Sequence, residues 1–129
     1  MIKSYITVLV SLLVIDGLWI GVIAKNFYHK YLGFIFADKF VLWPAGIFYL
    51  LYAFGVVFFV VNPALEAKSI GIALIRGALL GLVAYATYDL TNQATISKWP
   101  VIVTVVDIIW GALVTAVVSG ITYYVITKI

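Results

Sequence analysis

The sequence predicts an all-α integral membrane protein: a bundle of four transmembrane helices with an aromatic and basic interfacial loop between the first two. Composition gives the first support, because 66% of the 129 residues are hydrophobic, 10% are charged, and the mean hydropathy is +1.21. Soluble domains carry about 25% charged residues. Four long apolar segments give the second support, and they leave room for one transmembrane domain over residues 1–129.

The first expected span covers residues 4–24 and contains a single charge, Asp16. At about 1.5 Å per residue, this segment is long enough to cross a hydrocarbon core of about 30 Å. A cleaved signal peptide is the alternative interpretation, since Lys3 precedes the apolar run. Asp16 and Trp19 stand where such a peptide should end in small residues, so we expect the span to be retained.

The connection over residues 25–40 mixes cations with aromatic rings. This mixture favours the headgroup boundary, where the segment could be partly helical and act as a lid. We interpret His29, the single histidine, as an interfacial anchor. The mixed residues are Lys25, His29, Lys30 and Lys39 with Phe27, Tyr28, Tyr31, Phe34, Phe36 and Phe40.

The remaining spans are expected at residues 41–61, 69–92 and 99–127. Asn62-Pro63 is expected to end the second span. In the third span we expect Arg76 to reach the headgroups or Glu66. The lysines and arginines divide four to four between the two sides of the bundle, so the positive-inside rule does not set the orientation and dual insertion stays a hypothesis.

The third and fourth spans carry the pattern of closely packed helices. Gly77 and Gly81 form a small-xxx-small pair that would let another helix come close. The fourth span has small or polar residues at spacings of three and four, which is typical of a face inside a bundle. These residues are Thr104, Asp107, Gly111, Thr115, Ser119 and Thr122.

A polar pocket is expected in one half of the bundle. Asp16 lies nine residues before Lys25, and Asp107 lies nine after Lys98, so both should sit about 13 Å deep in the same leaflet. Asp89 should lie less deep. The expected pocket residues come from all four spans: Asp16 and Trp19; Tyr49 and Tyr52; Tyr85, Tyr88, Asp89 and Asn92; and Thr104 and Asp107.

Three carboxyl groups at membrane depth need a reason. Each central charge costs about 2.5 to 3.5 kcal/mol on the insertion scale, so we expect all three to point inward. One interpretation is that they only hydrogen-bond neighbouring helices. The other is that they exchange protons near neutral pH, with Asp16 and Asp107 as the deeper pair and Asp89 as a relay. No metal motif or cofactor fingerprint is present, so we expect neither.

Two segments share the pattern D-x-x-W: Asp16 to Trp19 and Asp107 to Trp110. The two helices should run antiparallel, so the pattern does not place the tryptophans at equal depth. We interpret this echo as chance.

The string Tyr85 to Asn92 (Y-A-T-Y-D-L-T-N) is the most specific feature of the chain. Read with the D-G-L-W string that begins at Asp16, the K-N-F-Y string that begins at Lys25 and the pair Trp99-Pro100, it resembles a family of small bacterial membrane proteins classed as a domain of unknown function. The resemblance covers nearly the whole chain. It implies four helices in the bacterial inner membrane and no particular activity, so catalytic residues stay unidentified.

Three functions are open. The pocket favours a proton-coupled carrier or binder of an amphipathic or cationic small molecule, as a homodimer or larger assembly if it transports. An intramembrane enzyme could use paired aspartates as general acid and base on a lipid or isoprenoid. An accessory subunit of another membrane protein is the third. The lysines flank apolar runs, so lipid and not nucleic acid is the expected partner. A cavity open to one leaflet would favour the enzyme, and access from alternate sides would favour the carrier.

Overall fold

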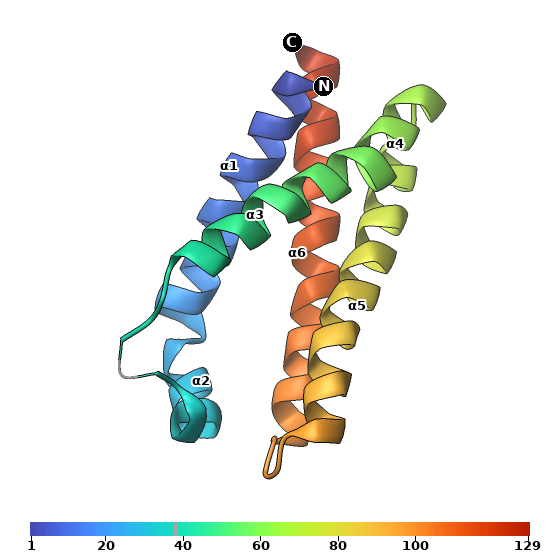
Figure 1. Ribbon diagram of the computed structural model, residues 1–129. Helices are drawn as coiled ribbons and strands as arrows, with labels where there is room; N and C mark the ends of the chain where they lie inside the picture. Colours follow the sequence, from blue (N-terminus) through green and yellow to red (C-terminus); the bar gives the residue numbers. More distant parts are fainter. Residues whose placement is uncertain (38) are drawn as a thin grey trace.

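The computed structural model describes residues 1–37 and 39–129, so Asp38, in the connection after the first span, lies outside the described residues. The protein is 88% helical, and its described residues contain no strand. Four helical stretches are long and apolar enough to cross a membrane: Ile2–Ile23, Trp43–Ala67, Ile70–Thr95 and Val101–Lys128. Both ends of the chain lie at one end of the bundle, and α2 lies at the other (Figure 1). The predicted all-α membrane bundle is confirmed.

Several of the stretches contain more than one element. The first is α1 (Ile2–Leu18) continued by the π-helical η1 (Trp19–Ile23), and the second is α3 (Trp43–Val56), the π-helical η3 (Val57–Val61) and α4 (Asn62–Ala67). Between them lie α2 (Lys25–Leu32) and the 3-10 turn η2 (Gly33–Ile35). The third and fourth are α5 (Ile70–Thr95) and α6 (Val101–Lys128). The interfacial loop therefore contains a short helix of its own.

The second stretch continues past Asn62-Pro63, contrary to the expectation that this pair ends it. Proline fits near the start of α4 because a first helical turn needs no donor at that position. Pro63 has no N–H for the carbonyl of Phe59, four residues earlier, but Nη1 of Arg76 donates to that oxygen at 3.4 Å. Arg76 thus supports the helix beside it, a contact that sequence reasoning did not anticipate.

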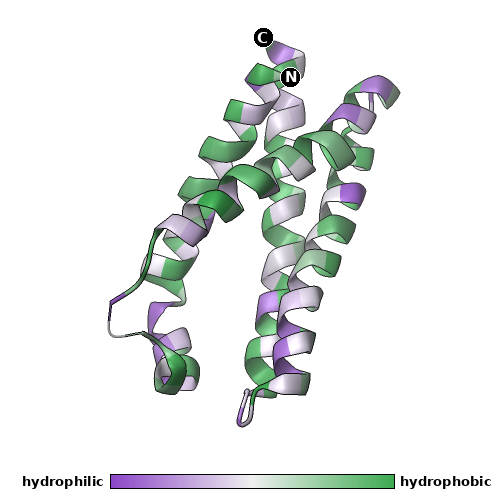
Figure 2. Cartoon of the chain, in the orientation of Figure 1, coloured by the Kyte–Doolittle hydropathy of each residue, from purple (hydrophilic) through white to green (hydrophobic). Residues whose placement is uncertain are grey.

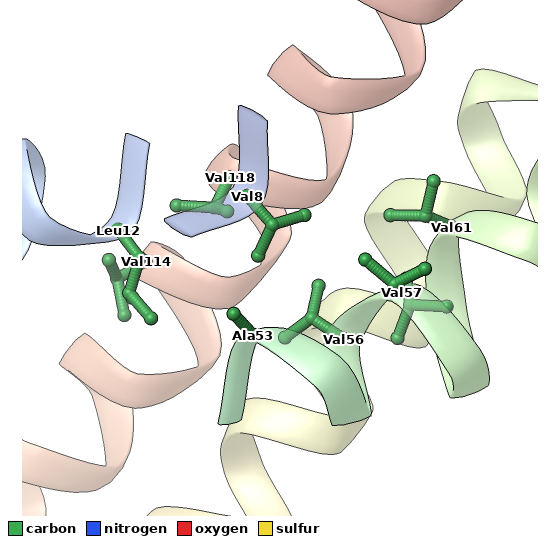
Figure 3. Close-up of a cluster of buried hydrophobic side chains, with 9 residues drawn as sticks. Val8, Leu12, Ala53, Val56, Val57, Val61, Val114 and Val118 are labelled. Carbon is green, nitrogen blue, oxygen red and sulfur yellow. The ribbon is translucent and has the colours of Figure 1, made fainter. Parts of the chain in front are cut away.

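The half of the bundle nearest the chain ends, here called the closed half, is filled by apolar side chains. Figure 3 shows this cluster, in which small β-branched residues from four elements meet. Its buried members are Val8, Leu12, Ala53, Val56, Val57, Val60, Val61, Val114 and Val118. The centre of this half is therefore occupied by packed apolar side chains.

Helices α5 and α6 pack so closely that glycine is needed between them. A Cβ on Gly81 would lie 2.0 Å from the carbonyl oxygen of Gly111, and one on Gly77 would lie 2.8 Å from that of Thr115. The predicted small-xxx-small contact is therefore confirmed. The small and polar face of the fourth span is also buried, including Ser119 and Thr122.

Helix α3 runs obliquely across the bundle, from beside α1 at its start to beside α5 where it joins η3 and α4 (Figure 1). Figure 2 shows α1 and α3 as mainly hydrophobic along their length, with hydrophilic colour on α2 and on the ends of α5 and α6 beside it, and again at the other end of the bundle on α4 and at the C-terminus. Because α3 reaches α5 only in the closed half, the other half, here called the cavity half, is left less filled.

Candidate functional site

A cavity of about 660 Å³ lies in the cavity half. Its walls come from α1 and η1, from α2 and the segment after it, and from α3, α5 and α6. Six of the ten residues predicted from the sequence line it: Asp16, Trp19, Tyr49, Tyr85, Tyr88 and Asp107. The structure thus brings together side chains from every one of the four spans.

One wall of the cavity lies at the side of the bundle. Phe48 of α3 and Tyr88 of α5 line facing walls, and these side chains are 44% and 59% exposed. Ile20 on η1, which also lines the cavity, is half exposed. Since these residues lie within the spans, their exposed surface faces lipid, so this wall of the cavity borders one leaflet.

Asp16 is held at the cavity by two donors. The indole Nε1 of Trp110 on α6 donates to Oδ1 at 3.0 Å, and the hydroxyl of Tyr49 on α3 donates to Oδ2. The Asp16 side chain is buried, so both oxygens would be unpaired without these donors. Using both oxygens as acceptors is the arrangement of an ionised carboxylate.

Asp107 is held from the interfacial helix. The hydroxyl of Tyr28 on α2 donates to its Oδ1, and Nε1 of Trp19 donates to the Tyr28 oxygen at 3.0 Å. Burial raises the pKa of the Tyr28 phenol, and the hydrogen bond to Asp107 raises it further, so Tyr28 keeps its proton and acts as a donor. This chain of hydrogen bonds fixes α2 over the cavity.

The two D-x-x-W segments meet at the centre of the site. The rings of Trp19 and Trp110 stack with centroids 4.3 Å apart and planes 9° apart, so the two tryptophans lie at the same depth, contrary to the expectation from the sequence. Each tryptophan serves the other segment's aspartate: Trp110 directly to Asp16, and Trp19 through Tyr28 to Asp107. In each segment the aspartate and the tryptophan are three residues apart and share one helix face, so in an antiparallel pair each tryptophan can lie beside the other segment's aspartate.

Asp89 lies behind the cavity, against α6. It is fully buried, it does not line the cavity, and neither of its oxygens has a donor among the described residues. Its carboxyl group lies within hydrogen-bonding reach of Asp107. The close carboxyl pair is therefore Asp89 and Asp107, whereas the sequence led us to expect Asp16 and Asp107. Among the described residues, no three His, Cys, Asp or Glu side chains gather as a metal site would require.

Three further residues expected in the pocket lie beside it. Tyr52 shares a hydrogen bond of 2.8 Å with Oγ1 of Thr115, below the cavity. Thr104 belongs to a separate polar cluster at the turn between α5 and α6, where it accepts from Nε1 of Trp99 at 3.1 Å and donates to Oε1 of Gln93 at 2.8 Å. Asn92 is half-buried and does not line the cavity.

Sequence reasoning missed Tyr28 and Trp110 as site residues. Tyr28 was interpreted as one interfacial aromatic among many, and nothing local marks it, because only the docking of α2 brings it to Asp107. Trp110 did carry a signal in the repeated D-x-x-W pattern. Lys25 and His29 also line the cavity, one turn apart on α2.

Comparison with known proteins gives a family but no described activity. Residues 1–124 match the family described as "Predicted membrane protein (DUF2177)", whose function is unknown. No significant match is found among curated proteins or among solved structures. The family match covers all of α1 to α5 and most of α6, including every residue of the cavity. The chain therefore belongs to the Predicted membrane protein (DUF2177) family and is a multi-pass membrane protein.

Proposed function

We propose that the protein binds an amphipathic molecule with a cationic head, which enters the cavity sideways from one leaflet. The observation that supports this most is the setting of Asp16, a carboxylate surrounded by the rings of Trp19, Trp110 and Tyr49 at the cavity wall. We expect the membrane to be the bacterial inner membrane, as the resemblance in the sequence implies.

Aromatic faces and a carboxylate together suit an ammonium group. A cation over an aromatic face gains about 0.5 to 2 kcal/mol, more when it is out of water, and Trp is the best partner. Each Asp16 oxygen accepts one hydrogen bond and has a further lone pair for a ligand. Few other side-chain sets satisfy a charged head so far from water.

The rest of the cavity suits an apolar tail. Ile20, Phe48 and Tyr88 form its lateral wall and face lipid, so a chain bound there would continue into the bilayer. Lys25, on α2, lines the end of the cavity nearest the interface. Repulsion from this lysine would turn a cationic head toward Asp16, which orients the ligand with its charge deep and its tail sideways.

Binding, rather than transport, is the function we propose. Release into the opposite leaflet would require the closed half to open, and the valine cluster around Val57 and Val118 fills it. A proton-coupled carrier would need a second arrangement of these helices.

The test compares amphiphiles with the same tail in lipid nanodiscs by titration calorimetry. Dodecylammonium, which carries the charge and N–H donors, should bind at least tenfold more tightly than uncharged dodecanol, and Asp16→Asn should remove most of that difference, since it removes the charge and keeps an acceptor. Glu66→Gln makes the same change of net charge on α4, away from the cavity, and is the matched control. Equal affinity for the two amphiphiles, or an unchanged preference in Asp16→Asn, would refute the proposal.

The second candidate is an enzyme that acts on a lipid, and one observation favours it: the cavity is confined to one half of the bundle, next to a pair of carboxyl groups. Such a pair can divide the roles of general acid and base. Incubation with a total bacterial lipid extract, followed by mass spectrometry, tests this function. A lipid converted by the parent and only bound by Asp107→Asn would replace the binding function with the enzymatic one.

A further inference from the structure

We infer that Asp89 and Asp107 form a proton-binding site, in which two buried carboxyl groups hold one exchangeable proton between them. Asp89 is fully buried and has no donor among the described residues, and Asp107 is 8% exposed. An orphaned carboxyl group at this depth needs a partner that the two side chains alone do not supply.

The geometry identifies the missing partner as a hydrogen. The two carboxyl groups are within hydrogen-bonding reach, yet two ionised carboxylates have only acceptors to offer each other. One proton converts this contact into a short O–H···O⁻ hydrogen bond. Tyr28 occupies one oxygen of Asp107, which leaves the other for Asp89.

The groups around the pair indicate that its missing partner is a proton and not a positively charged side chain. Asp16 on α1 interacts electrostatically with Asp107, and Tyr28 on α2 donates a hydrogen bond to it. Two further phenols, those of Tyr85 and Tyr88 on α5, lie nearby. Among the described residues, no lysine, arginine or histidine side chain hydrogen-bonds to either oxygen of Asp89. With negative or neutral neighbours on every packed element, ionising both groups together is strongly disfavoured.

Tyr28 also gives the proton a route. Its side chain lines the cavity beside Asp107 and its hydroxyl contacts that carboxyl group, so the proton can exchange with the cavity from Asp107 itself or through the phenol on α2. The binding of a proton here does not depend on which molecule the cavity takes, and it can be tested without any ligand.

The experiment is infrared spectroscopy of the full chain in lipid nanodiscs at pH 7, read at the C=O stretch of a protonated carboxyl group. Exposed carboxyl groups, with pKa values near 4, are ionised at this pH and do not contribute. The parent should show the band. Asp89→Asn should lose it, since the Asn amide can donate to Asp107 in place of the proton. The matched control Asp16→Asn, another buried carboxyl group near the cavity, should keep it.

Each other result counts against the site. A parent without the band at pH 7, or a band that survives in Asp89→Asn and disappears in Asp16→Asn, overturns the assignment. If Asp89→Asn does not fold, the parent is measured alone at a series of pH values. Its C=O band must persist from pH 5 to pH 7. A band that disappears over the same pH range in which exposed carboxyl groups ionise would refute the pair. A band that is present in choline chloride and absent in sodium chloride would show that a sodium ion, and not a proton, is the partner of the two carboxyl groups.

Discussion

The closed half and the cavity half of this bundle contain segments of the same helices, but apolar packing holds the first together and hydrogen bonds between polar side chains hold the second. In the closed half, valines and a leucine from α1, α3, η3 and α6 meet without a gap, and glycines bring α5 against α6. In the cavity half, α3 departs from α5, two tyrosines and a tryptophan donate to Asp16 and Asp107, and Asp89 lies buried behind them. A site that holds buried charges is costly to keep, so it depends on neighbours whose packing is close enough to hold the helices in place.

The largest effect should come from widening the closest helix contact. Gly81→Ala would place a Cβ 2.0 Å from a backbone oxygen, and backbone cannot move aside as a side chain can. We expect a loss of about 3 kcal/mol or more in the free energy of unfolding, measured by chemical denaturation in detergent.

Gly55→Ala on α3 is the matched control, because a Cβ there meets nothing within 4 Å. It should be neutral or slightly stabilising, since alanine favours helix. Equal stability of the two variants would show that α5 and α6 are not held as closely as the comparison requires.

A smaller loss is expected from a cavity made in the closed half. Leu12→Ala should cost about 2 kcal/mol, at the low end for such a change, because the unfolded helices stay in lipid and only packing contacts are lost. The neighbouring Leu13→Ala, at a side chain that faces lipid, should cost little. Thermal unfolding of both variants measures the difference, and similar losses would mean that the valine cluster contributes no specific packing.

Cutting the link between α2 and the cavity should have a more modest effect. Tyr28→Phe removes the hydroxyl that joins Trp19 to Asp107, with an expected loss of about 1 kcal/mol and faster hydrogen exchange in residues 25–32. Tyr31→Phe, on the same helix, leaves both bonds in place and is the control. If exchange in α2 is unchanged by Tyr28→Phe, the phenol does not hold the helix down.

The smallest expected effect is a pH dependence. The raised pKa of Tyr28 means that the folded protein holds this proton more tightly than the unfolded chain, so its contribution is complete below pH 10, the ordinary tyrosine value, and is lost as pH rises above it. At pH 10.5 the loss is about 0.4 kcal/mol, after allowance for screening of a partly exposed phenol. Tyr28→Phe should lack this part of the alkaline destabilisation in unfolding curves at pH 8 and pH 10.5. Parallel curves for parent and variant would contradict it.

The sequence alone determined the membrane fold and much of its helix packing. Hydropathy and segment length decide whether a helix crosses a bilayer, and both are properties of a single segment, so four spans could be predicted. The closeness of α5 and α6 was also readable, because Gly77, Gly81 and the small face of the fourth span are local patterns. For the same reason, six cavity residues could be named from depth and helical spacing.

Only the tertiary structure decided which of these groups are partners. The exchange between Asp16 and Trp110, the docking of Tyr28 on Asp107, and the pairing of Asp107 with Asp89 all join residues from different helices. Depth counted along each span fixes one coordinate of a side chain and leaves free the rotation of the helix and the angle at which it crosses its neighbours. The oblique course of α3 and the position of α2 set those remaining coordinates, and they come from packing among all the helices together.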